Sequence, residues 1–161
     1  REQNAFEALR GILRSGAIDK RYRAWVSGRP RAPGLIDLPL AHDAGAQQRM
    51  VACFDERDMD RSKARSAQTE VLSRVETVLV GAMPYSLVEV RAASARRHQV
   101  RVHLAAYGHP LVGDALYGGV SLVEGDHHRL HASFLGWTWR GERVEVASEP
   151  PSGFSRGLYR G

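Results

Sequence analysis

The sequence predicts an α+β fold in which a largely antiparallel mixed sheet is flanked by a few helices. Most segments alternate apolar and polar residues, as half-buried strands do, and few have apolar residues at helical spacing. Short turns with glycine or proline join them, and the order is rich in strands. The chain has 161 residues, 43% hydrophobic and 25% charged, which suits a globular protein with one core. We therefore expect a single domain over residues 1–161.

The first elements follow from spacing and from glycine positions. Residues 3–15, "QNAFEALRGILRS", carry apolar side chains at helical spacing and predict an amphipathic helix that Gly16 ends. The next segment, "KRYRAWVSG", alternates and predicts a strand ending at Gly28. On this strand Tyr22 lies on one face, and Arg21 lies on the other.

The middle of the chain continues in strands. A short extended piece is expected at "LIDLPLAHD" and a strand at "QRMVACFD". The highly charged "ERDMDRSKARS" is typical of a solvated connector. The segments "AQTEVLSRVE" and "YSLVEVRAA" predict two strands with a turn around "GAMP".

One further helix and two strands complete the expected order. Apolar residues in "RRHQVRVHLAAYG" predict a helix that Gly108 closes. Late strands are expected at "HRLHASFLGWTW" and "RVEVAS", divided by a turn at "RGE". The last segment, "PPSGFSRGLYRG", predicts a loose tail.

Charge and cysteine content narrow the class of protein. The formal net charge is +5, and nearly all basic residues are arginines, since only Lys20 and Lys63 are lysines. Arginine excess favours a polyanionic partner such as RNA, although a GC-rich genome would produce the same bias. One cysteine, Cys53, cannot form a disulfide within the chain, so we expect a cytoplasmic protein. No apolar run approaches a membrane span, and no signal peptide opens the chain, so no membrane partner is expected.

Metal and phosphate motifs are weak. His127, His128 and His131 lie close together, but the following residues read as a strand, which breaks the helical spacing that a zinc site favours. We expect no metal, and a histidine-based metalloenzyme is the weakest of the hypotheses. The segment "VGDALYGG" lacks the Lys-Ser/Thr of a phosphate loop, and no G-x-S-x-G elbow is present.

The strongest candidate site precedes the helix at "RRHQVRVHLAAYG". Arg96, His98, Gln99 and Arg101 place hydrogen-bond donors where a helix leaves free N–H groups and a positive dipole end. The pattern predicts a corner that attracts anions. A solvent-exposed face with scattered arginines is the alternative.

These residues resemble a family. The segment "ARRHQVRVHLAAYGHPLVGDALYGG" is similar to the Gly-Arg-x-His-Gln-Ile-Arg-x-His-Leu, Gly-His-Pro-Ile-x-Gly-Asp and Leu-Tyr-Gly signature of RluA-type RNA pseudouridine synthases. "DKRYRAWVSG" resembles the family's Lys-x-Tyr-x-Ala-x-Val-x-Gly strand. "SAQTEVL", "RLHASFLGW" and "VASEPPSGF" resemble later landmarks in the same order, so the likeness extends from about residue 3 to about residue 154.

The resemblance implies an isomerase acting on rRNA or tRNA. A uridine is flipped out of the RNA, its glycosidic bond is broken, and the base is rejoined through carbon 5 without cofactor or metal. Tyr22 would stack on the flipped base, and Arg96 would pair with a catalytic aspartate. A monomer is expected. The resemblance also places further residues in contact with substrate or in the pocket wall: Arg21, His98, Gln99, Arg101 and His131.

The sequence departs from the family at its nucleophile. The His-Arg-Leu-Asp motif is absent, and none of the aspartates stands in that context: Asp19, Asp37, Asp43, Asp55, Asp58, Asp60, Asp114 or Asp126. We therefore expect a catalytic domain incomplete at its N-terminus. The alternative is a catalytically inactive RNA-binding relative, which Ala95 in place of glycine and Arg97 in place of Thr or Ser also favour. Whether an S4-like domain precedes the chain stays open.

Overall fold

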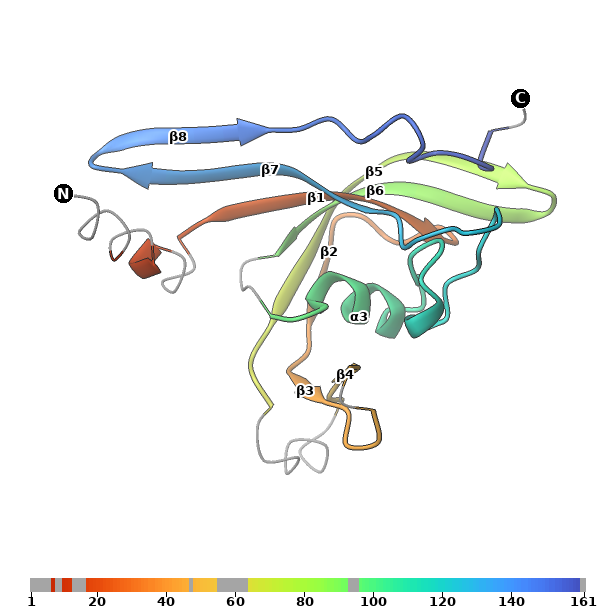
Figure 1. The fold of residues 1–161 in the computed structure, drawn as a ribbon, viewed down its shortest axis with the longest axis horizontal. Coiled ribbons are helices and arrows are strands. Elements are labelled where there is room, and N and C mark those ends of the chain that lie inside the picture. Colours follow the sequence, from red (N-terminus) through yellow and green to blue (C-terminus); the bar gives the residue numbers. More distant parts are fainter. Residues whose placement is uncertain are drawn as a thin grey trace.

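The structure is a computed structural model, and it describes residues 7, 10–12, 17–46, 48–54, 64–92 and 96–159. Six strands form one antiparallel sheet in the order β2-β5-β6-β1-β7-β8, and β3 and β4 form a separate pair (Figure 1). This confirms the expected α+β class. The elements are β1 Asp19–Ser27, β2 Gly34–Asp37, β3 Leu40–His42, β4 Met50–Ala52, β5 Gln68–Val80, β6 Met83–Ala92, α3 Gln99–Ala106, the 3₁₀ turn η1 Ala115–Tyr117, β7 Leu130–Trp139 and β8 Glu142–Ala147.

Some expectations fall on residues that are not described. Of the expected helix over 3–15, residues 7 and 10–12 are described and are helical, and the others lie outside the described residues. Most of the charged connector "ERDMDRSKARS" and Ala95 also lie outside them. None of the described helices is long and apolar enough to cross a membrane.

Strand β1 is central, and both of its faces are covered. Ala24 and Val26 are fully buried on the face that packs against α3. Trp25, on the other face, is also 0% exposed, because the chain after residue 150 returns across it. Leu158 packs on the indole, and the Trp25 Nε1–H donates to Ser155 Oγ at 3.2 Å. The prediction of a loose tail is therefore wrong: a buried apolar anchor and a hydrogen bond hold this segment.

Helix α3 lies between the sheet and the β3–β4 pair (Figure 1). Val100 and Leu104 belong to the core cluster of the sheet, whereas Val102 packs with Leu40 of β3 and Met50 of β4. The helix ends as predicted, and Gly108 adopts a φ of 86° that favours glycine.

The hairpin between β7 and β8 turns as the sequence predicts. Arg140 and Gly141 both have positive φ, at 51° and 86°, which is the backbone of a tight two-residue turn. The antiparallel pairing of β7 with β1 places Leu130 and His131, at the start of β7, opposite Ala24 and Arg23 of β1. That position brings the "HHRLH" segment close to Tyr22.

Candidate functional site

A cavity of about 370 Å³ opens where β1, the end of β6, the start of α3 and the start of β7 meet. Its volume lies within the range of small-molecule sites, about 300–1,000 Å³. Tyr22 and Arg96, which are far apart in the sequence, both line this cavity. The described lining residues are Tyr22, Ala92, Arg96, His98, Gln99, Val100, Arg101, His128 and Leu130.

Tyr22 enters the cavity from the middle of the sheet. It pairs with Val90 of β6 and Ala132 of β7, so a strand fixes its backbone on each side. Burial raises the pKa of its phenol, because the charged form loses water. The ring is therefore a neutral aromatic surface at pH 7, held on a rigid element.

Arg96 stands at the rim, before α3. Its Nε–H donates to the Ser66 carbonyl at 3.3 Å, and its backbone N–H donates to Gln99 Oε1 at 3.2 Å. The Gln99 amide donates in turn to the Gln68 carbonyl at 2.9 Å and to Thr69 Oγ1 at 3.3 Å. Gln99 is buried, so it ties the approach to α3 to the start of β5 and thereby positions Arg96.

The guanidinium of Arg101 is paired with a buried carboxylate. It donates two hydrogen bonds to the Asp114 carboxylate, at 2.8 and 2.7 Å, and lies 5.0 Å from the centre of the Tyr117 ring. The side chains are 13% and 1% exposed. The hydrogen bond to Asp114 raises the pKa of Arg101. Arg101 is therefore part of the cavity wall, and its guanidinium is held by Asp114.

His98 is held in a specific orientation. It has a positive φ of 54° just before α3, and its Nδ1 lies 3.0 Å from the Tyr117 hydroxyl. That hydroxyl also accepts the Met50 N–H at 3.0 Å. Burial, and then the charges of Arg101 and Arg97, lower the pKa of His98. The lowered pKa favours the neutral imidazole at pH 7.

His103 and His128 have different environments. His103 is fully buried, with Nδ1 2.8 Å from Thr69 Oγ1 and Nε2 2.9 Å from the Leu38 carbonyl, so it is a satisfied core residue. His128 lines the cavity, and burial followed by the Arg101 charge lowers its pKa. The described residues contain no group of three or more His, Cys, Asp or Glu that could hold a metal ion.

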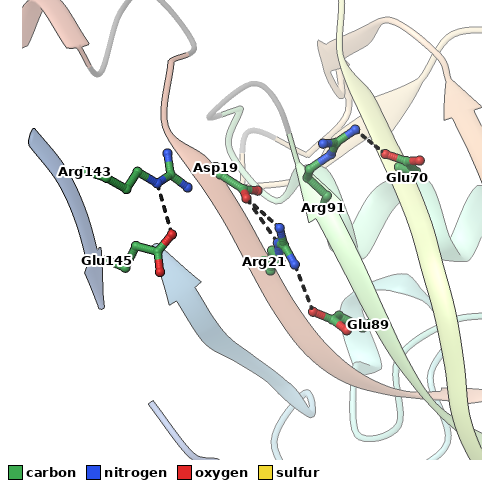
Figure 2. Close-up of polar contacts among 7 residues, drawn as sticks. All are labelled: Asp19, Arg21, Glu70, Glu89, Arg91, Arg143 and Glu145. Atoms are coloured by element: carbon green, nitrogen blue, oxygen red, sulfur yellow. Dashed lines mark hydrogen bonds and ion pairs between the residues drawn. The ribbon is translucent and has the colours of Figure 1, made fainter. Parts of the chain in front are cut away.

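Arg21 lies away from the cavity. It donates to Asp19 at 3.2 and 2.8 Å and lies 3.9 Å from Glu89 (Figure 2). Its guanidinium also lies over the Phe134 ring, 5.0 Å from the ring centre. Figure 2 shows that this arginine belongs to a row of alternating charges across the sheet, which includes Arg143–Glu145 and Arg91–Glu70. Arg21, which the sequence predicts to contact substrate, therefore lies outside this cavity and pairs with two carboxylates.

His131 also lies outside the cavity of Tyr22. Its Nε2–H donates to the Ser148 carbonyl at 2.9 Å, and its ring meets Phe154 edge-on at 6.2 Å between centroids. Sequence reasoning missed His128 as a cavity residue and Tyr117 and Asp114 as its supports. Asp114 and Tyr117 both belong to the motif "GDALYGG", which forms a short turn beside α3, so this motif could have indicated them.

Comparison with known proteins agrees with this geometry. The family described as RNA pseudouridylate synthase matches residues 1–106. The chain is 35% identical over 148 residues to "Ribosomal large subunit pseudouridine synthase D" of Zymomonas mobilis, covering 84% of this chain and 42% of that protein. It is 36% identical over 110 residues to "Dual-specificity RNA pseudouridine synthase RluA" of Escherichia coli, covering 68% of this chain and 45% of that protein.

A solved structure shows the same fold. Human RNA Pseudouridylate Synthase Domain Containing 1 superposes with a TM-score of 0.76 at 27% identity, covering 94% of this chain and 62% of that chain. The chain spans less than half the length of both curated relatives. Matched motifs, matched fold and a shared cavity for Tyr22 and Arg96 lead to one conclusion: the chain belongs to the RluA-type family of RNA pseudouridine synthases.

Proposed function

We propose that this chain is the C-terminal portion of the catalytic domain of an RNA pseudouridine synthase that isomerises uridine in rRNA or tRNA by base flipping. The observation that carries the proposal is the cavity of about 370 Å³, which Tyr22 and Arg96 line together. An extruded base needs a concave site with an aromatic surface, and Tyr22 supplies that surface as a neutral ring.

The reaction balances without a cofactor. The bond between N1 and C1′ breaks, a bond between C5 and C1′ forms, C5 loses a proton and N1 gains one. In this proposal Tyr22 holds the base during rotation, and Arg96 holds a carboxylate ionised beside C1′ by a charge-assisted hydrogen bond. In this proposal Gln99 and Arg101 do not contact the reacting atoms but position residues that do. Gln99 fixes the backbone of Arg96, and Arg101 lies over the Tyr117 ring, whose hydroxyl contacts His98.

The carboxylate itself has to come from elsewhere in the protein. The described residues that line the cavity include neither aspartate nor glutamate. Asp114, the buried carboxylate behind the wall, is bound by Arg101. We propose that a segment outside this sequence supplies the aspartate, in the His-Arg-Leu-Asp motif of the family.

The test uses the full gene product. Pseudouridine is mapped in rRNA and tRNA after incubation with the purified protein, and Arg96→Lys is compared with wild type. We expect new pseudouridine at defined positions, and a loss of turnover in Arg96→Lys because lysine cannot form the bidentate pair. A full-length protein that carries the aspartate and leaves both RNAs unmodified would refute the proposal.

The second candidate is an RNA-binding relative without catalysis, which the missing cavity carboxylate favours. The codons upstream of Arg1 discriminate the two: a His-Arg-Leu-Asp stretch there removes this candidate.

We further propose one domain, a monomer and a cytoplasmic location. The continuous sheet between residues 19 and 147 and the single cysteine support the first and the last of these. Size-exclusion chromatography of the full product tests the monomer.

A further inference from the structure

A second cavity, of about 380 Å³, is also lined by the segment that contains His128 and Leu130. These two residues line both cavities, so the hollows share a wall. The second cavity is enclosed by the loop over 123–129, the start of β7 and the returning C-terminal segment. None of the roles assigned above uses it.

Buried contacts hold this cavity in shape. Arg129 is 4% exposed, and its Nη2 donates to both oxygens of Asp126 at 3.1 and 3.0 Å. Its Nη1 donates to the Phe154 carbonyl at 3.3 Å, which joins the loop to the C-terminal segment. Its backbone also joins neighbouring elements, since Trp25 N–H donates to the Arg129 carbonyl at 3.1 Å. The cavity is thus preformed, as ligand sites usually are.

The lining favours a flat, neutral ligand with polar edges. Arg129 and Asp126 neutralise each other, and the exposed Arg156 and Glu124 have opposite charges. Free phosphate would therefore gain little net attraction. Phe154 offers a ring for stacking, and His131, with Nε2–H given to the Ser148 carbonyl, keeps Nδ1 as an acceptor when neutral. Aromatic rings and imidazoles are the side chains on which unstacked bases bind.

From this arrangement we propose that the second cavity binds the nucleobase next to the target uridine. The inference rests on the proposed function, because the first cavity then holds the extruded base. Consecutive bases are joined by one sugar–phosphate unit, and the two cavities are adjacent because both are lined by His128 and Leu130. In this proposal the base next to the flipped uridine occupies the second cavity. This cavity would therefore read the nucleotide that flanks the modified position.

Gly153 allows the cavity to be filled without disturbing the fold. It lines the cavity, a Cβ placed on it meets nothing within 4 Å, and its φ lies outside the positive range. Gly153→Leu is therefore the blocking variant, and His127→Ala, which shortens an exposed side chain of the same lining, is the second. Gly45→Leu is the matched control, since its Cβ meets only Asp43 at 3.6 Å, outside both cavities.

The assay measures equilibrium binding of the full-length protein to short single-stranded RNAs with one central uridine. A second set carries an abasic residue immediately 5′ or 3′ of that uridine. Base stacking contributes about 1–3 kcal/mol per base. We expect Gly153→Leu to weaken binding of the intact RNA about tenfold, which is about 1.4 kcal/mol, and to have no effect on one of the abasic RNAs. His127→Ala should weaken binding less, and Gly45→Leu should match wild type.

Two outcomes overturn the inference: Gly153→Leu binds the intact RNA as wild type does, or its effect persists unchanged on both abasic RNAs. Absence of measurable wild-type binding to these RNAs also counts against it. Conversion of uridine is measured separately on cellular RNA. If Gly153→Leu weakens binding of the intact RNA and not of one abasic RNA, but no uridine is converted to pseudouridine, the proposed function alone is rejected. If uridine is converted but Gly153→Leu has no such effect on binding, this subsite alone is rejected.

Discussion

Replacing Asp114 by alanine would leave the guanidinium of Arg101 in the cavity wall without its carboxylate. The two side chains are joined by hydrogen bonds of 2.8 and 2.7 Å, and Asp114 is 1% exposed. Breaking a buried pair by removing one partner costs about 3–5 kcal/mol, because the remaining charge has lost both water and partner.

The geometry places this pair at the lower end of that range. Arg101 keeps 13% of its side chain in solvent, and the Tyr117 ring 5.0 Å away still offers a face to the cation. We therefore expect a loss of about 3 kcal/mol in the free energy of unfolding. For a domain of this size such a loss lowers the thermal midpoint by about 6–12 °C.

Urea and thermal unfolding of Asp114→Ala, Arg101→Met and the double variant Arg101→Met/Asp114→Leu test the reasoning. The double variant should lose clearly less than the sum of two single losses, since an apolar pair leaves no charge buried. Arg143→Met is the control from the surface: the Arg143–Glu145 pair is about half exposed on both sides, so the change should stay within about 1 kcal/mol. If Asp114→Ala loses no more free energy of unfolding than Arg143→Met does, the Arg101–Asp114 pair does not stabilise the cavity wall.

Three further predictions concern the base platform, the core histidine and the C-terminal segment. Tyr22→Ala removes a stacking surface and should lower kcat/KM of the full-length enzyme about ten- to a hundredfold. Tyr22 also packs against the core cluster of the sheet, so activity is compared at temperatures where the variant is folded; a stability loss that accounts for the lost activity would assign Tyr22 to the core instead. Burial lowers the pKa of His103 in the folded protein below 6.5, so below that pH the unfolded chain binds more protons than the folded one. The free energy of unfolding that this histidine contributes is therefore complete above about pH 6.5 and is lost as the pH falls towards the folded pKa. Urea midpoints across this range should fall on acidification, and less steeply in His103→Gln; equal slopes would contradict the assignment. Leu158→Ala should cost about 2–5 kcal/mol and expose Trp25, seen as a red shift of its fluorescence relative to wild type, whereas an unchanged spectrum would mean that the tail does not cover the indole.

Much of the fold could be predicted because strands and turns are local. Alternation placed β1, β5, β6, β7 and β8, and glycine marked the end of α3 and the turn at Gly141. Contiguous motifs also marked Tyr22 and Arg96 as site residues, and the structure brings them into one cavity.

Side-chain partners far apart in the chain were beyond this reasoning. The sequence does not show which acidic side chains lie near Arg21 in space, whereas the register of β1 with β6 places Glu89 beside it. The segment "PPSGFSRGLYRG" has the composition of a loose tail, and only the folded sheet presents the Trp25 face on which Leu158 packs. The composition of a segment does not show which distant residues it contacts after folding.

The sequence by itself determined the alternating strands, the helix after Arg96 and the family signature, because each depends on residues that are neighbours in the chain. Only the tertiary structure decided which arginines are already neutralised, how His98 is held, and that two cavities share the wall at His128. The physical reason is that charge pairing, burial and cavity shape depend on distances in space, and antiparallel packing sets those distances between residues that the chain keeps far apart.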